Sequence, residues 1–128
     1  MKGVEATIRS EAPHPRGWRQ VRIATAFGHT RVLALATETP GLVVHTPIDS
    51  HDGAHWVVTH ERSGYAVARF VDQDGALEFC GLAREMTDWT LARSALPRNQ
   101  AFRNTVRQAA KLCGAVWPLS LPETGQWR

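Results

Sequence analysis

The chain has 128 residues, of which 43% are hydrophobic and 21% charged, values typical of one globular domain and unlike those of a disordered chain. No apolar run approaches the ~20 residues that a membrane-spanning helix needs, and the first residues lack the apolar stretch of a secretory signal. The two cysteines and the absence of a CxxC pair exclude a disulfide scaffold. These features predict a cytoplasmic protein that folds without disulfides.

The basic residues are concentrated near the end of the chain. The net charge is +3, but residues 61–89 carry an acidic excess of three and residues 90–128 a basic excess of five. Thirteen of the fifteen basic residues are arginine, whose planar guanidinium group matches phosphate oxygens. Two interpretations stay open: a partner that contains phosphate, or a GC-rich genome that favours arginine codons.

Strand patterns occupy the first part of the chain. Residues 4–8 are a candidate strand, and two prolines follow that prevent regular pairing. Residues 18–27 alternate between apolar and polar, and residues 30–37 are rich in Val and Leu, which predicts a hairpin with Gly28-His29 between its strands. One face of the first strand carries Val21, Ile23, Thr25 and Phe27, and the other carries Trp18, Gln20, Arg22 and Ala24.

A tight turn and a second hairpin follow. Thr39-Pro40-Gly41 predicts the turn, because proline presets φ at one central position and glycine accepts positive φ at the next; a short strand follows at 42–45. Residues 55–60 and 65–71 predict the second hairpin. We expect its large aromatic residues, Trp56 and Phe70, to lie in the core.

Helical patterns occupy the last part of the chain. The first helix is expected to begin with Asp74 as its N-cap and to end at Asp88-Trp89-Thr90. The second is expected to begin after the N-cap Asn99 and to end before Gly114, which suits a left-handed C-cap. Their apolar stripes are Ala76, Phe79, Ala83 and Met86, with Leu82 beside them, and Phe102, Val106, Ala109, Ala110 and Cys113.

Strands followed by helices predict an α+β fold. We expect an antiparallel sheet of about five strands in the N-terminal two thirds, with two helices packed on one of its faces. Residues 1–114 would form a single domain, and residues 115–128, with Trp117-Pro118 and Leu121-Pro122, an extended C-terminal tail.

Histidines cluster within sixteen residues of the chain, together with two aspartates. Imidazole and carboxylate are ligands for Zn²⁺, Mn²⁺ and Fe²⁺, so one alternative is a metal site. His51 and His55 have the i, i+4 spacing of a metal-binding pair on a helix, but Gly53 lies between them. No HExxH or HxH motif is present. We therefore expect no metal and no cofactor, and regard these side chains as polar groups of a loop and sheet edge. The alternative metal site would use His45, His51, Asp52 and His55.

Nucleophilic catalysis has no sequence support. Cys80 and Cys113 lie on or beside the apolar stripes, where a thiol is buried and unreactive. Ser63 precedes Gly64 in a hairpin turn and not at a strand-to-helix elbow, and no glycine-rich phosphate loop is present. We therefore predict that the protein is not an enzyme.

The second helix carries the clearest physical signal. Arg103, Arg107 and Lys111 are spaced at i, i+4 and i+8, so they project from one face, and no acidic residue in the helix relieves their repulsion. Arg93 and Arg98 lie just upstream. A negatively charged partner would relieve this repulsion, although a solvated helix face without a ligand is the simpler alternative.

Five tryptophans are many for a chain of this length. Trp18 shares a strand face with Arg22, and Trp117 and Trp127 lie in the tail. Tryptophan beside arginine stacks on single-stranded bases or anchors protein interfaces. The alternative is that the tail folds back and buries its two indole rings.

Residues 55–90 resemble a hairpin–helix pattern of small uncharacterised proteins of phages, plasmids and integrated elements. The resemblance rests on Trp56-Val57-Val58-Thr59-His60, Ser63-Gly64, Phe70 and Asp88-Trp89-Thr90. It implies a mobile-element setting, where small proteins often bind nucleic acid or block host defence machinery, and it brings no catalytic residues. The order of strands and helices is also similar, in architecture only, to single-strand binders built from four strands and a helix.

Together these features predict a non-enzymatic binding protein of a mobile element. Its partner would be nucleic acid or a nucleic-acid-handling complex, contacted through the basic helix. The alternative is an inhibitor or adaptor that binds a protein, for example an anti-defence protein of the anti-CRISPR kind. Homodimerisation is a further use that these surfaces allow.

Overall fold

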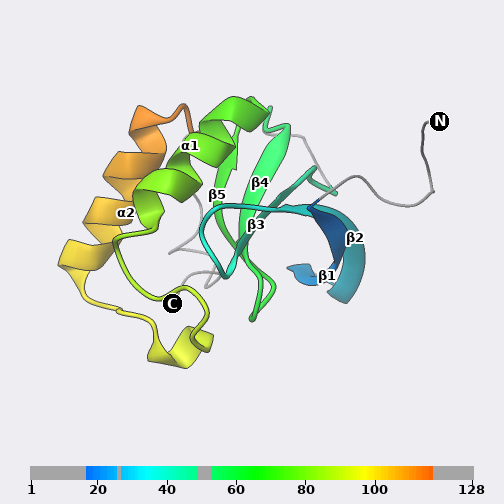
Figure 1. The fold of residues 1–128 in the computed structure, drawn as a ribbon, viewed down its shortest axis with the longest axis horizontal. Helices are drawn as coiled ribbons and strands as arrows, with labels where there is room; N and C mark the ends of the chain where they lie inside the picture. Colours follow the sequence, from blue (N-terminus) through cyan, green and yellow to red (C-terminus); the bar gives the residue numbers. More distant parts are fainter. Residues whose placement is uncertain (1–16, 26, 49–52, 117–128) are drawn as a thin grey trace.

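Five strands follow one another in the chain and pair in the same order, each antiparallel to the one before it. The computed structural model describes residues 17–25, 27–48 and 53–116 (Figure 1); the candidate strand at 4–8 lies outside them. Two α-helices and a short 3₁₀ turn complete the described chain, which confirms the α+β fold. The elements are β1 (Trp18–Thr25), β2 (Gly28–Ala36), β3 (Leu42–His45), β4 (Trp56–His60), β5 (Tyr65–Phe70), α1 (Gln73–Ala83), η1 (Arg93–Ala95) and α2 (Gln100–Leu112).

The sheet curls until its first strand reaches the β4–β5 turn. The backbone N–H of Ala24 donates to the carbonyl of Gly64 at 2.8 Å, and the Arg19 guanidinium pairs with the Glu61 carboxylate, with Nε 3.0 Å from Oε2. A Cβ at Gly64 would lie 2.8 Å from the Arg22 carbonyl oxygen, so this approach requires glycine. The curl encloses a small core of Val21, Ile23, Ala34 and Val43.

The main core lies on the opposite face of the sheet, where the helices pack over β3, β4 and β5 (Figure 1). Phe70 is fully buried, as predicted, and its ring centroid lies 5.5 Å from that of Phe79 on α1. Trp56 is only half-buried, because it pairs with Phe70 at the outer end of β4 and packs against the edge of the core. Trp56 was predicted to lie in the core, but its side chain lies at the edge of the core and is partly exposed.

Helix α1 begins and ends earlier than predicted. Its N-cap is Asp72 and not Asp74: Asp72 follows β5 in an extended conformation, and its Oδ1 accepts a hydrogen bond from the Gly75 N–H at 2.7 Å. Asp74 instead lies in the first turn, where a carboxylate interacts favourably with the helix dipole. The helix stops at Ala83 because the chain turns back to bury Trp89, whose indole Nε1 donates to the Ala83 carbonyl at 2.8 Å.

Two apolar residues are more exposed than their sequence patterns predict. Phe27 was expected on the same strand face as Val21 and Ile23, but Thr25 pairs with Gly28, so Phe27 lies in the turn and is fully exposed. Leu82, expected beside the buried stripe of α1, is 47% exposed, because it lies to one side of the face that packs on the sheet.

Helix α2 agrees with the prediction at both ends. Asn99 Oδ1 accepts from the Phe102 N–H at 2.7 Å, and Gly114 adopts a φ of +88° just after the C-cap. The chain then continues beside β5, where the Val116 N–H donates to the Arg69 carbonyl at 2.7 Å. No helix within the described ranges is long and apolar enough to cross a membrane.

Candidate nucleic-acid interface

Helix α2 places three cations along one side. Arg103 and Arg107 are half-buried and Lys111 is exposed, so the row runs along the border of the exposed face. The Arg103 guanidinium donates to Gln100 Oε1 at 3.3 Å. No ion pair joins the row to a carboxylate of the described chain, so its charge is not neutralised there.

The two upstream arginines differ in their surroundings. Arg98 is exposed and immediately precedes the Asn99 N-cap. Arg93 is half-buried, and its guanidinium carbon lies 4.3 Å from the centroid of the Tyr65 ring, a cation–π distance that fixes η1 against β5. Arg93 therefore has a structural contact of its own. We define the α2 basic surface as Arg98, Arg103, Arg107 and Lys111.

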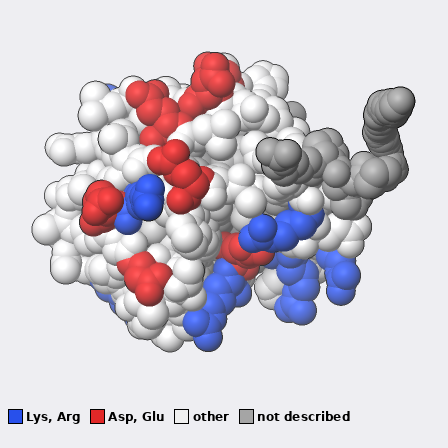
Figure 2. All heavy atoms as spheres, viewed as in Figure 1, with Lys and Arg blue, Asp and Glu red and all other residues white. Residues whose placement is uncertain are grey.

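The helix next to α2 is acidic. Figure 2 shows carboxylates gathered over α1 and the segments beside it, with one basic side chain among them. A phosphate would be repelled from this face and attracted to α2, so the charge distribution would orient a polyanion on the molecule. The acidic residues are Asp72, Asp74, Glu78, Glu85 and Asp88.

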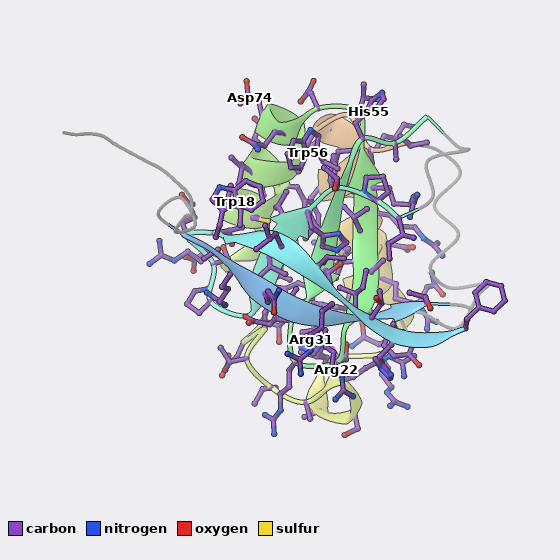
Figure 3. The ribbon with its side chains drawn as sticks, turned by 90° about the vertical axis from the view of Figure 1, so that its right-hand side faces the viewer. Trp18, Arg22, Arg31, His55, Trp56 and Asp74 are labelled. Carbon is purple, nitrogen blue, oxygen red and sulfur yellow. The ribbon has the colours of Figure 1, made fainter. Side chains whose placement is uncertain are left out.

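Of the four clustered histidines, the side chain of His45 forms hydrogen bonds inside the fold, and that of His55 forms none with the described residues. His45 is buried; its Nδ1 lies 2.9 Å from the Thr46 carbonyl and its Nε2 2.7 Å from Thr59 Oγ1. His55 is exposed at the start of β4 (Figure 3), while His51 and Asp52 lie outside the described residues. Within the described ranges, no three His, Cys, Asp or Glu side chains are placed to hold a metal ion.

His60 is also built into the structure. It is fully buried on β4, with its ring centroid 6.5 Å from that of Trp89. Nε2 lies 2.9 Å from the Leu91 carbonyl and Nδ1 2.7 Å from Ser63 Oγ. A carbonyl only accepts, so Nε2 carries the proton and Nδ1 accepts from the serine hydroxyl. By the same reasoning, the Thr46 carbonyl places a proton on Nδ1 of His45.

The two buried histidines predict a loss of stability in mild acid. Burial lowers the pKa of both His45 and His60 below the usual 6.5. The unfolded chain therefore takes up protons first as the pH falls below about 6.5, and stability is lost until the pH passes the folded pKa. We expect urea denaturation to give a lower free energy of unfolding at pH 5 than at pH 7.5. A pH-independent free energy over this range would contradict the burial of two neutral imidazoles.

Neither cysteine provides a reactive thiolate. Burial raises the pKa of Cys80 to about 12 and also raises that of Cys113, so both thiols keep their protons near neutral pH. Ser63 donates to His60, but it also accepts from the Tyr65 N–H at 3.2 Å and lies in the β4–β5 turn. Its contacts are those of a turn residue.

The tryptophans divide between core and surface. Trp89 is fully buried, and Trp18 is half-buried at the start of β1. Trp117 and Trp127, the candidate aromatic contacts of the tail, lie outside the described residues. Among the three candidate aromatic contacts, the structure therefore places Trp18 alone.

The sequence reasoning missed a second basic surface, on β1 and β2. The chain has no acidic residue between Glu11 and Glu38, a segment that contains four arginines. That local charge bias was a usable signal, but it does not show which arginines the hairpin brings together. Arg22 and Arg31 of this segment lie directly opposite each other in the hairpin (Figure 3).

Comparison of this chain with protein-family models, with curated proteins and with solved structures finds no match.

Proposed function

We propose that this protein is a non-enzymatic nucleic-acid-binding protein that contacts phosphates through the α2 basic surface. The observation that carries the proposal is the row of Arg103, Arg107 and Lys111, which has no carboxylate partner in the described chain. Like charges at i, i+4 spacing destabilise an isolated helix. A polyanion along the helix removes this cost and gains charge-assisted hydrogen bonds.

The spacing of the row favours an extended polyanion over a small one. Residues four apart on a helix are separated by about 6 Å along its axis, so the row spans about 12 Å. A single phosphate reaches one or two of these side chains, whereas a nucleic-acid backbone offers a phosphate to each.

The proposal is tested by removing the row. Alanine is the best helix former, so Arg103→Ala, Arg107→Ala and Lys111→Ala together should preserve α2. We expect the slope of log K against log salt for a short duplex to become shallower by about two to three units, since each phosphate contact contributes about 0.9. Fluorescence anisotropy at several salt concentrations measures this slope.

A matched control is Arg84→Ala, which removes an exposed cation from the acidic helix. It should leave the slope unchanged. An equal slope for the wild type and the triple variant, or no oligonucleotide binding by the wild type at low salt, would contradict the proposal. If the wild type binds no oligonucleotide but the row is required to bind an acidic protein, the inhibitor or adaptor alternative replaces it.

A further inference from the structure

The β1–β2 hairpin leaves part of the sheet face uncovered. The residue pairs Trp18–Leu35, Gln20–Leu33 and Arg22–Arg31 share one face of the hairpin, and Leu35 pairs with Val44 of the main core. This is the face that the helices cover over β3, β4 and β5. Over β1 and β2 it is open: Arg22, Arg31 and Gln20 are exposed, and Leu33 is 44% exposed.

Two arginines lie side by side on this open face. Arg22 and Arg31 are direct cross-strand partners, a relation that places Cβ atoms about 4.5–5.5 Å apart. Figure 3 shows the two residues next to each other at the lower edge of the hairpin. Neither forms a hydrogen bond or an ion pair with another residue of the described chain, so two like charges oppose each other without compensation.

Nothing in the hairpin itself balances these charges. β1 and β2 contain no acidic residue, and the Glu61 carboxylate, which reaches β1 across the curl, is paired with Arg19. Figure 2 shows basic side chains on the side of the molecule away from the acidic α1. In Figure 1 the hairpin and α2 lie on opposite sides of β3, β4 and β5, so the hairpin is a surface separate from α2.

We propose that this hairpin face is a second binding surface, for a single strand of nucleic acid. Two adjacent guanidinium groups form a clamp for a phosphate, because each offers a fork of donors that matches phosphate oxygens and the anion screens their mutual repulsion. Leu33 and Trp18 supply apolar surface on the same face, against which an unpaired base can pack. A duplex hides its base faces and would not use these residues.

The test is the double variant Arg22→Gln and Arg31→Gln. Arg84→Gln is the control, because it makes the same chemical change at an exposed arginine outside the hairpin. We expect the slope of log K against log salt for a 12-nucleotide single strand to become shallower by about 0.7 units, since the two arginines clamp one phosphate and each phosphate contact contributes about 0.7 in single strands. Leu33→Ser should weaken single-strand binding several-fold without changing the slope. The melting temperature of the double variant should equal or exceed that of the wild type, because the change removes a repulsion.

The proposal is overturned if the double variant keeps the wild-type slope with the single strand. It is also overturned if the double variant loses binding to polyglutamate but not to the oligonucleotide, which would assign the clamp to an acidic peptide. These outcomes are independent of the α2 basic surface, whose triple variant is measured beside it. If both surfaces bind the same single strand, the slope losses measured with that strand add in a variant that combines all five substitutions.

Discussion

Replacing Trp89 with alanine is expected to lower the free energy of unfolding by about 3–5 kcal/mol, the range for aromatic-to-alanine changes in a core. Trp89 is 1% exposed and its ring centroid lies 6.0 Å from that of Phe102 on α2. Its indole N–H also donates to Ala83 at the end of α1. One side chain therefore connects both helices, and its loss leaves a cavity between them and removes one of the two hydrogen bonds that the Ala83 carbonyl accepts, the other coming from the Met86 N–H.

Urea denaturation followed by circular dichroism measures this loss. Trp56→Ala is the matched control, because it removes the same side chain from a half-buried position. Its cost should be clearly smaller. A loss below about 1 kcal/mol for Trp89→Ala, the size typical of an average substitution, would contradict the placement of this residue in the core.

Gly41→Ala is expected to cost about 2–5 kcal/mol. Gly41 has a φ of +96°, and a Cβ there would lie 2.3 Å from the Trp89 carbonyl oxygen. The left-handed conformation costs a residue with a side chain about 1–2 kcal/mol, and forcing a methyl group into a packed contact costs about 1–3 kcal/mol more. Because the contact is with backbone, no side-chain rotation relieves it.

Gly114→Ala separates the two contributions to this cost. Gly114 has a similar φ of +88°, but a Cβ there meets nothing within 4 Å. It should therefore show the conformational cost alone. Equal destabilisation by the two substitutions in thermal or urea denaturation would show that the 39–41 turn does not pack against the backbone of Trp89.

Local signals predicted the elements of this fold well. Asn99 and Gly114 marked α2 because capping is a property of a few neighbouring residues. The end of α1 was mispredicted because Met86 continues its helical spacing, whereas the chain leaves the helix to bury Trp89, a tertiary effect that periodicity does not contain. The curl of the sheet depends on the contact of β1 with Gly64, forty residues further along the chain, and hydrophobic alternation carries no information about it.

The same distinction holds for the two basic surfaces. Arg103, Arg107 and Lys111 were found because helical spacing alone aligns them. The Arg22–Arg31 pair depends on the register of a hairpin. A turn at residues 28–29 would have paired Arg22 with Leu35, whereas the observed pairing of Thr25 with Gly28 brings the two arginines together. Moving a turn by two residues shifts every cross-strand pair.

The most direct measurement of where nucleic acid binds is an NMR titration of the ¹⁵N-labelled protein with short oligonucleotides at low salt. The α2 basic surface predicts concentration-dependent shifts of amides in residues 98–112, and the hairpin surface predicts shifts in β1 and β2 with a single strand. The amide chemical shifts of the acidic helix α1 should not change, and these residues serve as the internal control. Shifts confined to α1, or no shifts at any residue, would contradict the claim that this protein binds nucleic acid through its basic surfaces.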